Sequence, residues 1–291
     1  ADVDDPTAPL EQRVLRMIDE FAQRLSKLVA DWLRVGYCQG NFNSDNCLVA
    51  GRTMDYGPFG FLEKYDPLWN MWVGGGEHFA FMNQPKAAHK NFFSFVQAVA
   101  PLLSESAVKE AQAAVNSFPA VCGKICGEMW SRKLGLKQWD GEAESLFDEL
   151  KSLMASSSVD YTIFWRQLAA VAERGEERDA VDTLGEAFYD GLTLTQKDQW
   201  TEWLSRWQKK MKADGLPEAA QSMRLTSPKY VPREWMLVEA YEAANKGDYA
   251  LIHSLYDLFS KPFDERPEHE AKYYRKAPAS AEERGGTAFM S

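Results

Sequence analysis

Residues 40–67 read GNFNSDNCLVAGRTMDYGPFGFLEKYDP, and this stretch decides the fold. Glycine, asparagine, aspartate and proline crowd around two short apolar patches, Cys47 to Val49 and Thr53 to Met54. Such punctuation is typical of loops that enclose short strands. The stretch therefore predicts a loop, a short strand, a turn, a second short strand and another loop, which together make a short β-hairpin.

Polar side chains flank this predicted hairpin on both sides, at Asn43, Asp45, Asn46 and Asp55. Mg²⁺ requires oxygen ligands, retains several waters, and takes one or two carboxylates together with substrate phosphates. The cluster is therefore a candidate half-site for a metal and a nucleotide. The same residue types also make ordinary turns, and spacing alone leaves that alternative open.

The tripeptide Asp55-Tyr56-Gly57 follows a short apolar segment, nine residues after Asn46. This spacing is similar to that of kinases, in which a catalytic-loop Asn and the Asp of Asp-Phe-Gly hold the metals that bridge the ATP phosphates. Aligning Asn46 with that Asn places Gln39, Gly40 and Asn41 where kinases carry His-Arg-Asp. Because an Asn cannot accept a proton from a hydroxyl, ordinary protein phosphorylation is disfavoured, whereas metal and nucleotide binding remain expected.

The whole stretch resembles the selenoprotein O family signature HGVxNTDNMSIxGxTIDYGPFGFxDxYDP. Further stretches resemble the same family, and the likeness extends from about Leu10 to Pro278. They are FAFMNQPKAAHKN (79–91), DYTIFWRQL (160–168) and SPKYVPREWMLVEAYEAANKGDY (227–249).

The resemblance implies a mainly α (α+β) fold: the C-terminal lobe of a protein-kinase-like fold, with a short β-hairpin at the metal site and a helical C-terminal extension. It also implies a protein adenylyltransferase that transfers AMP from Mg·ATP to Ser, Thr or Tyr hydroxyls of proteins. By the same resemblance, Asp45 is the catalytic proton acceptor, Asn46 is a Mg²⁺ ligand, and Asp55 binds both Mg²⁺ and ATP. The expected cofactor is Mg²⁺, with Mn²⁺ as the alternative, and ATP is the substrate.

This chain departs from the family pattern in three places. The phosphate loop, lysine and arginines of the family lie in an N-terminal lobe that has no counterpart here, so we expect the chain alone to be inactive. The motif's histidine is Gln39 and its valine is Asn41, and we expect neither to touch the metal set. The chain ends in Ala-Phe-Met-Ser instead of Cys-Ser-Ser, so redox control through a terminal chalcogen is not implied.

Two other functions stay open. One is a catalytically inactive pseudokinase that binds nucleotide and acts as a scaffold. The other is a purely helical interaction module, which predicts no metal dependence. Whether AMP or UMP is transferred is also undecided by the sequence.

Composition limits the partners and the compartment. The 291 residues carry 33 Lys and Arg against 43 Asp and Glu, a formal charge of −10, which disfavours nucleic acid as a partner. No apolar run approaches the length of a membrane span, so we expect no membrane partner. We also expect a monomer. The four cysteines fit a reducing, intracellular compartment. The family resemblance implies the mitochondrion or plastid in a eukaryote and the cytoplasm in a bacterium. The Cys122-x₃-Cys126 spacing lacks the further ligands of a zinc site.

Apolar periodicity predicts a mostly helical chain. We divide it into a kinase-like C-lobe segment with the catalytic and metal loops (1–110), a helical C-terminal part packed on that lobe (111–278) and a loose tail (279–291). The expected helices are 10–35, 85–103, 105–117, 119–133, 141–154, 160–174, 178–190, 195–213, 233–245 and 248–259, with breaks at 215–217 and 227–229.

Several conspicuous side chains have plain structural explanations. Trp200, Trp203 and Trp207 recur at steps of three and four, which predicts one buried helical face. Arg233 is expected to tie the helical part to the catalytic lobe. His78 and His89, without partner carboxylates, are expected to be surface or capping residues, and Lys209, Lys210 and Lys212 to complement a helix dipole. For Gln84-Pro85, a helix start and a substrate contact both stay open.

Overall fold

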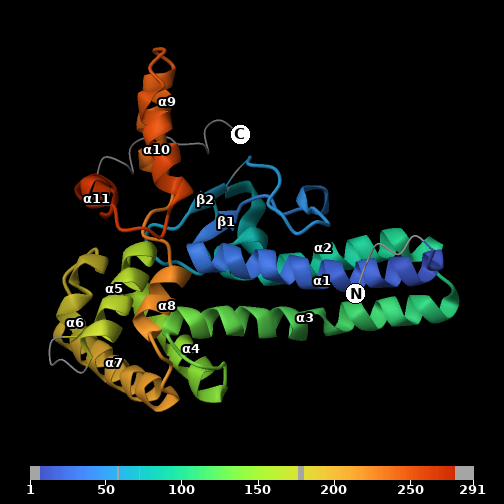
Figure 1. The fold of residues 1–291 in the computed structure, drawn as a ribbon, viewed down its shortest axis with the longest axis horizontal. Helices are drawn as coiled ribbons and strands as arrows, with labels where there is room; N and C mark the ends of the chain where they lie inside the picture. Colours follow the sequence, from blue (N-terminus) through green and yellow to red (C-terminus); the bar gives the residue numbers. More distant parts are fainter. Residues whose placement is uncertain (1–6, 58, 72, 176–179, 279–291) are drawn as a thin grey trace.

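The computed structural model describes residues 7–57, 59–71, 73–175 and 180–278, and this part of the chain is mainly helical with a small two-stranded sheet (Figure 1). The predicted α-rich class with a short β element is thereby confirmed. In chain order the elements are α1 (Leu10–Val35), β1 (Tyr37–Gln39), η1 (Ser44–Asn46), β2 (Phe59–Phe61), η2 (Val73–Phe79), η3 (Phe81–Asn83), α2 (Gln84–Val99), η4 (Ala100–Leu102), α3 (Glu105–Leu134), α4 (Gly141–Ser156), α5 (Tyr161–Arg174), α6 (Ala180–Thr183), η5 (Gly185–Ala187), α7 (Leu194–Asp214), α8 (Ala219–Thr226), α9 (Glu234–Ala244), α10 (Ala250–Ser260) and α11 (Pro267–Tyr273), where η marks a 3₁₀ helix.

Helices α1, α2 and α3 lie side by side as long rods (Figure 1). The apolar face of α1 is buried at the predicted spacing, for example at Ile18, Leu25 and Trp32. The helix ends at Gly36, whose φ of 77° is left-handed and whose missing Cβ would lie 2.8 Å from the ring of Tyr161. A glycine is therefore needed there both for the turn and for the close approach.

Helix α3 runs without interruption through Pro119, so the predicted break between 117 and 119 is wrong. Proline lacks the N–H that would bond the carbonyl of Val115. That carbonyl instead accepts a hydrogen bond from Nε2 of His89 at 2.9 Å, and the His89 ring stacks on Phe118 with centroids 5.6 Å apart. A side chain from α2 thus satisfies the group that the proline leaves free.

The hairpin predicted at 47–54 is reduced to a single antiparallel bridge, and the strands of the sheet lie outside it. The sheet pairs β1 with β2 in antiparallel register, Tyr37 opposite Phe61 and Gln39 opposite Phe59, and the described part of the intervening loop contributes a bridge between Cys47 and Thr53. This part of the loop also contacts α1, because Trp32 donates from Nε1 to Oγ1 of Thr53 at 2.9 Å.

The helix predicted for 178–190 is replaced by α6 and η5, and its first two residues lie outside the described part of the chain. The segment that follows pairs with the start of α5. The main-chain N–H of Asp160 donates to the oxygen of Ala187 at 2.7 Å, and Val159 bridges Phe188. The bridge needs extended chain at Phe188, which a continuous helix would exclude.

The C-terminal half follows the predicted breaks at 215–217 and 227–229, which separate α7, α8 and α9, although α8 and α11 were not predicted. Trp200, Trp203 and Trp207 are all buried on one face of α7, as expected. Helices α9 and α10 project from the rest of the molecule as a hairpin (Figure 1) and share a second, smaller core. Its buried members are Tyr230, Trp235, Met236, Ala240, Leu255, Leu258 and Tyr273.

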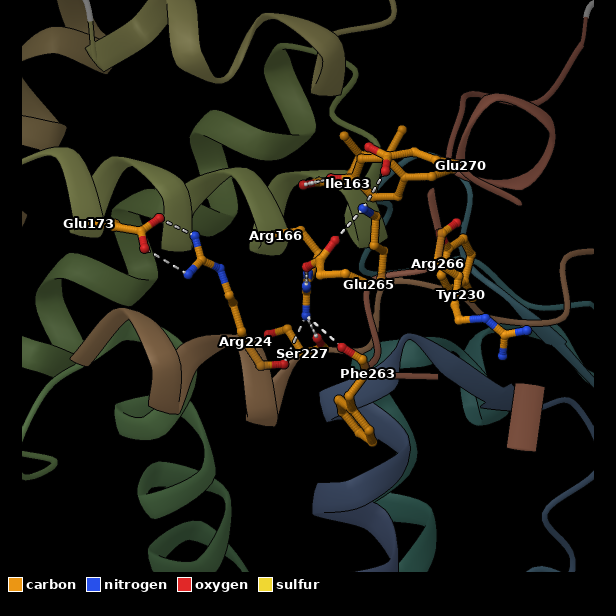
Figure 2. A network of polar contacts seen from close by, with 12 residues as sticks. Ile163, Arg166, Glu173, Arg224, Ser227, Tyr230, Phe263, Glu265, Arg266 and Glu270 are labelled. Carbon is orange, nitrogen blue, oxygen red and sulfur yellow. Dashed lines mark hydrogen bonds and ion pairs between the residues drawn. The ribbon is translucent and has the colours of Figure 1, made fainter. Parts of the chain in front are cut away.

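A network of polar contacts joins α5 to the end of α8 and to residues 263–270 (Figure 2). The buried guanidinium of Arg166 donates to the main-chain oxygens of Arg224 at 3.0 Å and Ser227 at 3.3 Å, and it pairs with Glu265. Lys229 adds a bond to Glu270 at 2.9 Å. These contacts join α5, the end of α8 and the segment before α11 into one unit.

No helix within the described ranges combines the length and the apolar character needed to cross a membrane. The predicted loose tail, residues 279–291, lies outside the described residues.

Candidate functional site

All four predicted site residues lie on the loop between β1 and β2. Asn43 and Asp45 are exposed, Asn46 is half-buried at the end of η1, and Asp55 is exposed on the returning arm. The β1–β2 pairing closes the loop at its base, and the bridge between Cys47 and Thr53 joins its two arms. Because Asn46 and Asp55 are one and two residues from that bridge, their Cα atoms lie no more than ~17 Å apart.

The side chain of Asn46 is held by the loop itself. Its Nδ2 donates to the main-chain oxygen of Asn41 at 2.9 Å, and Nδ2 of Asn43 donates to Oδ1 of Asn41 at 2.6 Å. Among the described residues, Oδ1 of Asn46 has no hydrogen-bond partner. The expectation that Asn41 does not touch the metal set is therefore wrong, because its carbonyl orients the amide so that the oxygen is left available as a ligand.

Asp45 lies at the centre of η1 with its carboxylate exposed. Within the described part of the chain, it makes neither a hydrogen bond nor an ion pair, and the structure shows no direct bond from it to Asn46 or Asp55. A carboxylate in this state can accept a proton from a hydroxyl that approaches from solvent.

Asp55 has an unusual backbone. Its φ of 57° is left-handed, which is uncommon for a residue with a side chain. Oδ1 accepts a hydrogen bond from the N–H of Gly57 at 3.1 Å, which closes an Asx turn. Oδ2 has no partner among the described residues, so one carboxylate oxygen remains available for a cation.

Gln39 contacts Asp55 directly, so the expectation that it stays clear of the metal set is wrong. Its Nε2 donates to the main-chain oxygen of Asp55 at 2.6 Å and to that of Met54 at 3.3 Å, while its Oε1 accepts a hydrogen bond from the hydroxyl of Tyr37. The sequence held one clue: the replacement of a histidine by glutamine retains an N–H donor at this position.

Two further residues support the loop: Gln84, which the sequence singled out only as a helix start or a substrate contact, and Asn91, to which the sequence assigned no role. Gln84, fully buried at the start of α2, accepts from the N–H of Gln39 at 3.0 Å and donates to the oxygens of Tyr37 and Phe81, both at 3.0 Å. Asn91 donates to the oxygen of Phe42 at 2.8 Å. Because Gln84 is buried and Pro85 occupies the first turn of α2, the helix-start interpretation of this pair holds.

The histidines and the cysteine pair contribute no metal centre. His78 is exposed and packs on Phe79, and His89 supports α3 as described above. The Sγ atoms of Cys122 and Cys126 are 4.0 Å apart. The described residues contain no group of three or more His, Cys, Asp and Glu side chains placed to hold a metal.

Magnesium does not need such a group, because it takes one or two protein carboxylates and completes its shell with water and phosphate. The available donors are the Oδ2 of Asp55 and the Oδ1 of Asn46, both hard oxygens. The residues present therefore fit Mg²⁺ and do not fit a softer metal that prefers nitrogen or sulfur.

A cavity of about 1000 Å³ lies beyond the end of β2, lined in part by Glu63, Tyr65, Trp69 and Trp235. Burial raises the pKa of the Glu63 carboxyl, and the charge of Arg233 opposes that shift. None of the four predicted site residues lines this cavity. The candidate site is thus an exposed loop surface, separate from this cavity.

Comparison with known proteins identifies the family of the chain. The family model described as protein adenylyltransferase SelO matches residues 6–260. The chain is 33% identical over 291 residues to the protein nucleotidyltransferase YdiU of Flavobacterium johnsoniae, covering 98% of this chain and 55% of the relative. For the proteins of that name from Xanthomonas campestris and Aromatoleum aromaticum, identity is 32% and 31%, with 97% and 94% of this chain and 54% and 52% of the relatives covered. The chain thus spans about half the length of the curated relatives it matches, and it belongs to the SelO protein adenylyltransferase family.

Proposed function

We propose that this chain supplies the metal-binding half of a nucleotide-transfer site, and that the complete site moves AMP from ATP to Ser, Thr or Tyr hydroxyls of proteins. One observation carries the proposal. The loop presents an amide oxygen of Asn46 and a carboxylate oxygen of Asp55 without protein partners among the described residues, and each is fixed by a hydrogen bond through the other half of its side-chain head group.

The residues have separate roles in this proposal. Asn46 and Asp55 would hold Mg²⁺, or Mn²⁺, and Asp55 would also contact ATP. A bound divalent cation supplies charge neutralisation of the phosphates. The hydroxyl oxygen of the protein substrate forms a bond to the α-phosphorus, the bond from that phosphorus to the oxygen bridging to the β-phosphate breaks, and pyrophosphate leaves. The hydroxyl proton passes to the carboxylate of Asp45.

Adenylyl transfer is favoured over phosphoryl transfer for two reasons. Asn41 occupies the position of the kinase base and cannot accept a proton. The chain also belongs to a family described as protein adenylyltransferases, and its relatives are named nucleotidyltransferases. The kinase-like lobe at 1–110, the packed helical part at 111–278, the monomeric state and the intracellular location remain predictions of the same proposal.

The proposal is tested with α-labelled and γ-labelled ATP in Mg²⁺. The protein tested is this chain, alone and joined to the remaining part of the F. johnsoniae relative. We expect no label from the chain alone. The joined protein should transfer label from the α position only, and Asp55→Ala and Asp45→Asn should each abolish that transfer. The matched control Asp190→Ala removes an exposed carboxylate outside the loop and should retain the label.

Other results would select other functions. Transfer from the γ position would mean a kinase whose base lies elsewhere. Intact Mn·ATP binding without any transfer would favour the pseudokinase scaffold. Absence of all metal and nucleotide binding would favour the helical interaction module.

A further inference from the structure

We propose that Gln39 is a positioning residue for the metal loop, that it fixes the main chain of Asp55, and that Gln84 anchors it from α2. This inference rests on the proposed function, because it concerns the same site. It adds supporting roles for Gln39 and Gln84, and in these roles neither residue contacts the metal or the nucleotide.

The first step is the backbone of Asp55. A left-handed φ costs a non-glycine residue roughly 1–2 kcal/mol and persists only where the surroundings hold it. Nε2 of Gln39 donates a hydrogen bond to the main-chain oxygen of this residue at 2.6 Å. Because the backbone angles set the direction of the Cα–Cβ bond, this hydrogen bond also sets where the carboxylate points.

The second step is the rigidity of Gln39 itself, which is 1% exposed. Its side-chain amide donates to Asp55 and Met54 and accepts from Tyr37, and its main-chain N–H donates to Gln84. A side chain with all of its polar groups satisfied in a dry environment has one low-energy orientation. Because Gln39 lies on β1 and has one orientation, it holds the main chain of Asp55 at a fixed position relative to β1.

The third step is the anchor. Gln84 donates to the oxygens of Tyr37 and Phe81 while it accepts from Gln39, so one buried amide joins β1, η3 and α2. The chain thus contains a continuous line of hydrogen bonds from α2 through Gln84 and Gln39 to Asp55. Second-sphere partners of this kind orient metal ligands, and their loss typically lowers metal affinity about 10–100-fold.

The chemistry of position 39 predicts which substitutions preserve the function. It requires a donor toward Asp55 and an acceptor toward Tyr37. Methionine matches the shape of glutamine and offers neither. Histidine, present in the family signature, offers one donor and one acceptor in its neutral form.

The test measures Mn²⁺ binding in the presence of ATP by electron paramagnetic resonance on the 291-residue chain. We expect Gln39→Met to raise the apparent Kd about tenfold or more and Gln39→His to stay within about threefold of the wild type. The control Gln112→Leu alters an exposed glutamine on α3 and should leave the Kd unchanged. If Gln39→Met lowers the unfolding temperature but leaves the Kd at the wild-type value, Gln39 is only a core residue and the inference is wrong.

A second readout needs no metal. Backbone ¹⁵N order parameters at residues 54–57 should fall from about 0.85 toward 0.6 or below in Gln39→Met and recover in Gln39→His. Unchanged order parameters in Gln39→Met would overturn the inference. Failure of the wild-type chain to bind Mn·ATP would instead count against the proposed function, so the two failures are distinguishable.

Discussion

Arg233 and Asp160 form a two-pronged ion pair across 73 positions of sequence, with Nη1–Oδ2 and Nη2–Oδ1 both 2.7 Å. Asp160 also caps α5 by accepting from the N–H of Ile163 at 2.9 Å, and Arg233 additionally pairs with Glu63 beyond β2. This cluster joins the segment that carries the metal loop to α5 and to the start of α9. Arg233 thus ties the helical part to the segment after β2, as expected, while the identity of that segment as part of a catalytic lobe remains a prediction.

Replacing Arg233 with Met should destabilise the fold by about 3–5 kcal/mol, because it leaves the buried carboxylate of Asp160 without its counter-charge. The free energy of unfolding in urea measures this change. The control is Arg206→Met, which removes an exposed pair with Glu149 and should cost less than about 1 kcal/mol. An equal loss of unfolding free energy in both variants would show that the buried ion pair stabilises the fold no more than the exposed one.

Removing the imidazole of His89 should destabilise α3 by about 1–3 kcal/mol, since His89→Leu leaves the buried carbonyl of Val115 without a donor. In Pro119→Ala, the new N–H at 119 can bond the same carbonyl, so the cost of His89→Leu should shrink in that background. Urea unfolding of the four variants of the cycle gives the coupling energy. His253→Leu, at an exposed position on α10, should change little. Additive costs for His89 and Pro119 would contradict this assignment.

Lys133 should make stability rise with pH. Burial, and to a lesser degree Arg34, lowers the pKa of its ammonium well below the ordinary value. The folded chain therefore binds this proton less tightly than the unfolded chain. Between the folded pKa and the unfolded value near 10.4, unfolding then takes up protons, so the free energy of unfolding increases with pH by up to about 1.4 kcal/mol per unit.

Lys133→Met should remove that slope. Denaturant midpoints between pH 7 and pH 9.5 measure it, below the range in which buried tyrosines titrate. Lys137→Met, at an exposed position just after α3, should retain the wild-type slope. An unchanged slope in Lys133→Met would mean that Lys133 stays charged in the fold, held by its bonds to the oxygen of Arg34 at 2.7 Å and to Oγ of Ser227 at 3.1 Å.

Alanine should have opposite effects at two glycines. Gly51 has a φ of 66°, and an added Cβ would lie 2.6 Å from Cβ of Arg24 and 2.9 Å from its main-chain oxygen. Gly51→Ala should therefore cost more than about 1 kcal/mol. Gly123 lies exposed within α3 with open space around it, so Gly123→Ala should stabilise by about 0.5–1 kcal/mol. Thermal unfolding distinguishes the two signs, and stabilisation by Gly51→Ala would contradict the packing of the loop on α1.

Local sequence signals predicted the parts of the fold that depend on near neighbours. The apolar spacing of α1 located its buried face, and the starts expected at 160 and 195 each lie one residue from the observed starts of α5 and α7. A helical face involves residues only three or four positions apart, so its pattern can be recognised in the sequence. Asn43, Asp45, Asn46 and Asp55 are also near one another in sequence, so their location on one loop could be predicted.

Partners distant in sequence decided the rest. Helix α3 continues through Pro119, where His89 from another helix donates to the carbonyl of Val115. The hairpin predicted at 47–54 is reduced to one bridge, and Trp32 of α1 bonds Thr53 there. Gln39 looked remote from the metal residues because 16 positions separate it from Asp55, yet pairing of β1 with β2 brings them into contact. The sequence by itself thus determined which residue types the loop offers. Only the tertiary structure decided how the main chain of Asp55 is held, because the hydrogen bonds of Gln39 and Gln84 join segments that packing brings together.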